Sequence, residues 1–411
     1  DTYVFNQNLD FTVNFDENVT VNTTGGTPQL ALTVGSTTRQ AVYQSGSGTQ
    51  NLVFRYTVQD GDADGDGIVI GTLSANSGTL RDAANNDANL TLNNVGNTSN
   101  VNVLATDVTY SSGSYSPTDP SGLNLTGYTL DVQDGTAVIT AATTFDDVTV
   151  QPDAVLDLNA DLTVNNELLF ESDATGSGQL ADATGATVTG DVRVERYFSN
   201  HRAFRLIASS VTTTGTIKAN WQEGVNNTDA NNQNPNPGFG MHITGSTTGA
   251  NGFDATNTGN PSVFTFDNTF TGTPQSDAYA AISNTDVLTL TVGTPYVALV
   301  RGDRSVDLTN NSSQGTTTLR ATGALHIGRY PSAGSVTLSQ VNDYWSLVAN
   351  PYQSKVDFSL LSTSDLRADI AVRDPQNNSW QTLTGANRII EPGESFFVQN
   401  LDNAESTPEA A

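Results

Sequence analysis

The densest group of side chains that could do chemistry is an acidic run early in the chain. Four aspartates, Asp60, Asp62, Asp64 and Asp66, alternate with small residues over seven positions. Carboxylates held this close repel one another, and a bound cation would relieve that repulsion. A set of oxygen donors of this density suits Ca²⁺ rather than a transition metal. The spacing therefore predicts a structural calcium site.

The acidic run does not form an EF-hand. That loop closes with a Glu at its twelfth position, and counting from either possible start the position holds Gly71 or Leu73. Further ligands must come from elsewhere, and Asp82 and Asp87 are the candidates. The alternative is a pair of tight turns without metal, because aspartate tolerates the backbone geometry of such turns. If calcium binds, we expect it to rigidify the fold rather than to catalyse a reaction.

Three tryptophans form the second group with a candidate binding role. Trp221, Trp345 and Trp380 could stack on sugar rings if they line an open groove. The alternative is burial, because aromatic side chains contribute much of the apolar area of a protein core. The sequence leaves both interpretations open.

No catalytic constellation stands out. The three histidines, His201, His242 and His326, lie far apart, in no metal-binding spacing, and the chain has no nucleophile elbow. The absence of cysteine excludes disulfides, thiolate metal ligands and cysteine nucleophiles. The integrin-type tripeptide at 301–303 follows an expected buried strand, so a hairpin turn explains it. We therefore expect a protein that is not an enzyme.

Composition excludes two classes of partner. The net charge is −27, from 16 basic and 43 acidic residues, and Lys218 and Lys355 are the two lysines of the chain. Nucleic acids and anionic membrane surfaces both require clustered basic residues. No apolar run approaches the ~18 residues that a spanning helix needs, so we expect no membrane insertion. Abundant Thr, Val, Asn and Gly favour strands and turns over helices.

The elements that must position these residues are predicted to be strands throughout. Residues 1–105 alternate polar and apolar side chains between regular turn signals, which indicates an Ig-like β-sandwich. Residues 106–190 hold very short strands between tight turns, a spacing typical of a short parallel β-solenoid, with a hairpin sandwich as the alternative. Residues 191–403 predict a larger C-terminal β-sandwich. The acidic stretch 404–411 indicates a disordered tail.

Two resemblances narrow the class of protein. The stretch Phe11–Val21, the Tyr56–Asp62 segment and the Asp82–Ala88 turn resemble repeat modules of very large bacterial surface adhesins. Later stretches, among them 194–197 and 349–353, resemble C-terminal regions of Bacteroidota proteins exported by the type IX secretion system, including gliding and adhesion proteins. The resemblance implies an extracellular location and the type IX machinery as a partner.

These observations together predict a rigid, non-enzymatic segment of a cell-surface adhesin or surface filament. Its expected partners are other surface proteins or further domains of the same giant chain. One alternative is an exported carbohydrate-binding or carbohydrate-active protein that uses its tryptophans, with glycans as the partner. The other is a self-assembling filament subunit linked by strand exchange. The chain begins with Asp1 rather than Met, so we expect a processed product or an excerpt.

Overall fold

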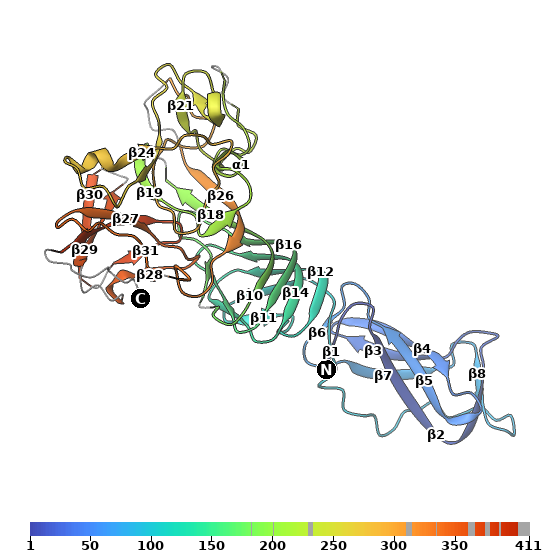
Figure 1. Cartoon of the computed structure of the whole chain (residues 1–411). Coiled ribbons are helices and arrows are strands. Elements are labelled where there is room, and N and C mark those ends of the chain that lie inside the picture. Colours follow the sequence, from blue (N-terminus) through green and yellow to red (C-terminus); the bar gives the residue numbers. More distant parts are fainter. Residues whose placement is uncertain are drawn as a thin grey trace. The chain divides into compact units, whose positions relative to one another are not determined.

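The fold is almost entirely β. The computed structural model in Figure 1 describes residues 1–181, 183–199, 201–228, 233–309, 315–333, 335–360, 366–374, 379–385 and 388–401. These residues form 32 strands, one α-helix and three 3₁₀-helices, which confirms the predicted all-β class. The chain divides into two compact units, Asp1–Leu130 with Thr143–Asp146, and Asp131–Ala142 with Asp147–Ala411. The stretch 404–411, predicted to be a disordered tail, lies outside the described residues.

The first unit contains a six-stranded antiparallel sheet in the order β7-β3-β4-β5-β2-β8. Alternating apolar residues bury one face, on which Leu30, Leu52 and Phe54 are almost fully inaccessible. The strands are β2 (Asn8–Asn22), β3 (Gln29–Val34), β4 (Thr37–Ser45), β5 (Thr49–Thr57), β7 (Val69–Ser74) and β8 (Thr79–Arg81).

A second, three-stranded sheet in this unit places the acidic run. Its order is β1-β9-β6, and β6 contains two residues of the run. The strands are β1 (Thr2–Tyr3), β6 (Ala63–Asp64) and β9 (Asn102–Leu104). Strands β10 (Val108–Ser111) and β11 (Ser114–Ser116) follow as an antiparallel hairpin.

One edge of the six-stranded sheet is open. Strand β2 pairs with β5 over residues 8–14 and again at Val19, but with β8 only over residues 20–22. Most of its outer edge therefore has no strand partner within the fully described stretch 1–181. Residues 89–97 make no backbone hydrogen bond to any strand. A hollow of about 740 Å³ is lined by this segment, by residues 10–16 and by Leu30, Ile70 and Leu73 of β3 and β7. Most backbone groups on this edge therefore take part in no strand ladder.

The predicted solenoid-like middle region is confirmed. The chain alternates between two sheets, so that β13, β15 and β17 pair in parallel in one, while β16 and β18 pair in parallel in the other. Each short strand buries its alternate side chains against its neighbours. The strands are β12 (Asn124–Val132), β13 (Thr136–Ile139), β14 (Thr143–Val150), β15 (Val155–Leu158), β16 (Leu162–Phe170), β17 (Gln179–Leu180) and β18 (Val188–Phe198).

Strand β18 also begins the C-terminal sheets, because its other edge pairs antiparallel with β26. Two four-stranded sheets follow, in the orders β19-β25-β23-β24 and β27-β32-β29-β30. Their facing sides share a core of buried residues, namely Leu206, Val297, Leu347, Ala371 and Phe397. The opposite face of the second sheet packs a separate core around Ile370 and Phe396.

The strands of this C-terminal part are β19 (Ala203–Ile207), β20 (Val211–Thr213), β21 (Thr244–Ser246), β22 (Asp254–Ala255), β23 (Val263–Phe266), β24 (Tyr279–Ala281), β25 (Tyr296–Val300), β26 (Thr317–Leu325), β27 (Trp345–Ala349), β28 (Val356–Asp357), β29 (Leu366–Asp374), β30 (Ser379–Leu383), β31 (Ile389–Ile390) and β32 (Ser395–Asn400). The helices are α1 (Ile217–Trp221), η1 (Ala250–Gly252), η2 (Gln275–Ala278) and η3 (Phe358–Leu360).

Candidate functional site

The acidic run is held by donors from the protein itself. Asp62 is buried, and its carboxylate accepts hydrogen bonds from the Arg39 guanidinium at 2.7–2.8 Å, from the Tyr56 hydroxyl and from the Gln59 N–H at 2.9 Å. The pKa of Tyr56 is raised, first by burial and then by this carboxylate. The negative charge of Asp62 is therefore balanced by a cation from the same chain.

The other predicted ligands also have partners of their own. Asp64 accepts hydrogen bonds from the N–H groups of Gly35 and Gly67 at 2.6 and 2.8 Å, and Asp60 accepts one from the Tyr128 hydroxyl at 3.0 Å. The Tyr128 pKa is raised to about 12, first by burial and then by Asp60. Asp66 is exposed.

Asp82 and Asp87 lie in a separate turn. Asp82 binds the backbone and side-chain nitrogens of Asn86, and Asp87 pairs with Arg81. Among the described residues, no group of three or more His, Cys, Asp or Glu side chains is placed to hold a metal ion. Each of these carboxylates except that of Asp66 is bonded to groups of the chain itself, and calcium binding stays a prediction.

The three tryptophans have different environments. Trp221 is 3% exposed and packs edge-on against Tyr296 in the core. Trp345 is half-buried and Trp380 is 51% exposed. These last two side chains lie in one groove of about 370 Å³.

The groove is lined mainly by aromatic rings, and we call it the aromatic groove. Phe266 lies edge-on to Tyr279 and to Phe397, with ring centroids 4.9 and 5.1 Å apart, and Trp380 meets Phe397 in the same way at 5.4 Å. The described residues that line the groove carry no charge, and they are Phe266, Gln275, Ser276, Tyr279, Trp345, Ala371, Trp380, Thr382 and Phe397.

Strand register explains how the second sheet presents this surface. On β29 and β30, Ala371 pairs with Thr382, and Arg373 pairs with Trp380, so alternate residues of both strands share the groove face. Phe397 on β32 lies opposite Ala371. The edge strand β30 has mostly exposed side chains, which leaves Trp380 open to solvent.

Two amide side chains fix the wall of the groove. The Gln275 side chain accepts a hydrogen bond from Trp345 N–H at 3.1 Å and donates one to Trp345 C=O at 2.7 Å. The side chain of Asn268 binds both backbone groups of Leu347 in the same manner, at 2.8 and 3.0 Å. These clamps join η2 and its flanking loop to β27, so the aromatic rings are positioned before any ligand arrives.

A buried ionic cluster lies elsewhere in the same unit. Arg304 and Asp254 are fully buried and form two hydrogen bonds at 2.8 and 3.1 Å, with His242 Nδ1 3.3 Å from the same carboxylate. The Asp254 pKa is lowered to about 2, because these two partners outweigh the effect of burial, which alone would raise it. Gln222 also donates to Asp254. With every member enclosed, the cluster acts as a structural anchor.

The tripeptide at 301–303 is part of this framework rather than a free loop. Asp303 accepts the Gly238 N–H at 2.7 Å, and burial lowers the pKa of Arg301 to about 10. Gly302 is buried with a φ of +129°, a conformation that glycine tolerates. The predicted hairpin is wrong, because β25, which precedes the tripeptide, pairs with β19 and β23, whereas the next strand, β26, pairs with β18 and β20.

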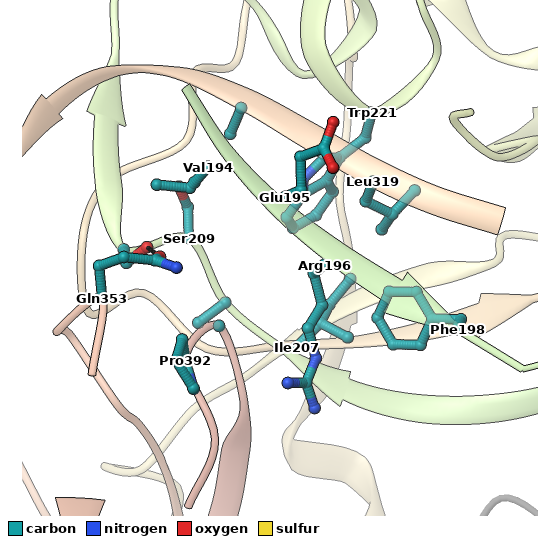
Figure 2. Close-up of a pocket in the computed structure, with 14 residues that line it drawn as sticks. Val194, Glu195, Arg196, Phe198, Ile207, Ser209, Trp221, Leu319, Gln353 and Pro392 are labelled. Carbon is teal, nitrogen blue, oxygen red and sulfur yellow. Dashed lines mark hydrogen bonds between the residues drawn. The ribbon is translucent and has the colours of Figure 1, made fainter. Parts of the chain in front are cut away.

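Figure 2 shows residues that line a small cavity, among them Glu195 and Arg196 of β18 and Trp221 of α1. Its volume of about 20 Å³ is enough for roughly one water molecule. Glu195 points toward Trp221, whereas Arg196 points to the other side of the strand. Burial raises the pKa of Glu195 to about 7. The cavity is too small for an organic ligand.

The sequence identified two residues of the aromatic groove, Trp345 and Trp380. It missed Phe266, Tyr279 and Gln275, since nothing in a strand pattern shows that strands far apart in the chain meet.

Comparisons of the chain with protein-family models, with curated protein sequences and with solved structures find no match. Within the described part of the chain, no helix has the length and apolar character needed to cross a membrane.

Proposed function

We propose that the protein is an extracellular adhesin segment that binds a carbohydrate chain in the aromatic groove, without chemical turnover. The observation behind this proposal is the aromatic, uncharged lining of the groove. Sugar rings have apolar faces that stack on exposed aromatic rings and hydroxyls that need polar partners at the rim. Trp380 and Trp345 supply the aromatic rings for stacking, and Ser276 and Thr382 supply polar partners for the sugar hydroxyls.

The surroundings of the groove support binding rather than catalysis. The described lining holds no carboxylate that could act as an acid or base and no nucleophile paired with a base. The side-chain clamps behind the rings keep the surface rigid, which lowers the entropy lost when a ligand binds. Rigid modules with a preformed groove suit passive attachment.

The test is glycan binding by Trp380→Ala. Truncating an exposed aromatic anchor should weaken binding by at least about tenfold, or ~1.4 kcal/mol. Binding would be screened on a glycan array and measured by calorimetry. Phe5→Ala removes another exposed aromatic ring, outside the groove, and should leave affinity unchanged. A wild-type chain that binds no glycan, or equal binding by Trp380→Ala, would refute the proposal.

We also propose export to the cell surface by the type IX route. The resemblance of the 194–197 and 349–353 stretches to exported Bacteroidota proteins supports it, as does the scarcity of lysine on a polar surface. Antibody labelling of intact source cells tests this directly. Labelling confined to permeabilised cells would contradict it.

One observation favours the filament alternative as a second candidate. The outer edge of β2 is unpaired over most of its length. Open edges of this kind add strands from other chains. The pattern Phe11-x-Val13-x-Phe15 reads the same in both directions, so two antiparallel copies of β2 would place Val13 opposite Val13 and Phe11 opposite Phe15.

A further inference from the structure

A second hollow in the C-terminal unit gathers arginines. Its volume is about 310 Å³, at the lower end of the range for small-molecule sites. Arg196 from β18, Arg205 from β19 and Arg373 from β29 line it, together with the 172–177 turn, and we call it the arginine cleft. The chain has 16 basic residues in total against 43 acidic ones, and three of the basic ones line this cleft together with the carboxyl side chains of Asp173, Glu391 and Glu394.

Two of these arginines have charged neighbours but, in the described part of the chain, no carboxylate at ion-pair distance. Within the described residues, neither Arg196 nor Arg205 forms an ion pair. Arg205 is 8% exposed and its Nε has no hydrogen-bond acceptor, while its Nη2 donates to the carbonyl of His201 at 3.1 Å. The guanidinium groups of Arg196 and Arg205 lie 5.9 and 5.7 Å from the Phe198 ring centroid. A buried donor without an acceptor is costly unless a ligand supplies one.

The carboxylates of the cleft make their hydrogen bonds and ion pairs with groups other than Arg196 and Arg205. Asp173 accepts from the backbone N–H of Thr175 at 2.7 Å and from its hydroxyl at 2.5 Å. Glu391 faces Lys355 at 3.8 Å. Glu394 accepts the Glu391 N–H at 3.0 Å, and its pKa is raised mainly by burial, although Arg196 opposes that rise. None of these three carboxylates accepts a hydrogen bond from Arg205 Nε.

The arginine cleft borders the aromatic groove through Arg373. Its guanidinium lies 4.8 Å from the Trp380 ring centroid, so this residue lines the cleft and stacks on the exposed tryptophan of the groove. Arg373 and Trp380 are also cross-strand partners on β29 and β30. A chain of sugars that stacks on Trp380 would thus extend past Arg373 toward Arg205.

We propose that the arginine cleft binds the carboxylate of an acidic sugar, so that the glycan held by the aromatic groove is a uronic acid polysaccharide. This inference rests on the proposed carbohydrate-binding function. Guanidinium groups match carboxylates in shape and charge. The neutral aromatic groove then holds one sugar ring. The arginine cleft favours a neighbouring sugar that carries a carboxylate over one that is neutral.

The experiment compares each acidic oligosaccharide with its methyl ester. Oligomers of galacturonic, glucuronic, mannuronic and guluronic acid would be titrated by calorimetry into the full chain, beside the corresponding methyl esters. Esterification removes the charge and keeps the sugar rings. We expect at least one acid to bind tenfold or more tightly than its ester, and added salt to weaken the acid alone.

Variants separate the two sites. Arg205→Gln and Arg196→Gln should remove most of the preference for the acid and leave binding of the ester unchanged, whereas Trp380→Ala should weaken both. Arg367→Gln, an exposed arginine on the same strand β29 that bonds Gln399, is the matched control and should behave as wild type. Thermal unfolding shows whether the buried Arg205 variant is folded, and the half-buried Arg196 variant serves if it is not.

The outcomes are distinct. Equal affinity for acid and ester overturns the acidic-sugar inference and leaves the carbohydrate-binding proposal intact. A preference for the acid that persists in both arginine variants also overturns it. Absence of binding to acids, esters and neutral glycans overturns the proposed function itself.

Discussion

At the scale of single residues, burial controls the protonation of Glu195. Its pKa of about 7 lies above the ordinary value of 4.5, because burial disfavours the charged carboxylate. Since the folded state holds the proton more tightly, the free energy of unfolding is highest at low pH with respect to this group. It falls as the pH rises from about 4.5 through about 7.

Glu195→Gln should therefore flatten the pH dependence of stability. We expect the variant to gain about 2 kcal/mol relative to wild type at pH 8 and little at pH 4.5. Urea unfolding at both pH values measures this difference. An unchanged slope between pH 5 and 8 in the variant would show that Glu195 ionises normally in the fold.

The buried cluster around Asp254 makes a second prediction at this scale. Asp254→Ala leaves the Arg304 guanidinium buried without its carboxylate, which should cost about 3–5 kcal/mol. Thermal unfolding measures the loss. Asp307→Ala removes an exposed aspartate in a nearby turn and should cost less than about 1 kcal/mol. Equal losses in the two variants would contradict the anchoring role of the cluster.

At the scale of elements, the acidic run behaves as a hydrogen-bonded turn. Asp62→Ala leaves Arg39 and the buried Tyr56 hydroxyl without their acceptor, so we expect the first unit to lose about 2 kcal/mol of stability. The loss should be the same in a chelator as in millimolar calcium. A melting temperature that falls in chelator for wild type, and not for the variant, would instead establish the predicted calcium site.

The elements also show what a sequence can and cannot predict. Short strands between turns such as Pro152-Asp153 predicted the parallel rungs, because each rung repeats one local pattern, and Asp153 does adopt a left-handed φ of +63°. The environment of Asp62 was not predictable, since Arg39 approaches it from another strand. For the same reason the alternation on β30 did not show that Trp380 would face Phe397 rather than a core.

At the scale of the whole molecule, the open edge of β2 bears on self-association. If the filament alternative holds, two copies pair through this edge, and Val13→Lys would place two like charges opposite each other and abolish pairing. Sedimentation velocity from micromolar to millimolar chain measures it. Val69→Lys, on the opposite edge strand β7, is the control. A wild-type chain that is monomeric throughout, or loss of association in the control alone, would contradict pairing through β2.

Strand β18 has a consequence for how the molecule withstands tension. Its residues pair in parallel with β16 and antiparallel with β26, so one strand is shared by the rungs and by the C-terminal sheets. A pulling force between these parts cannot peel β18 from one ladder without loading the other. Backbone hydrogen bonds that share a load break together rather than one after another. Strand β18 is therefore expected to resist forced unfolding more strongly than a strand held by one ladder.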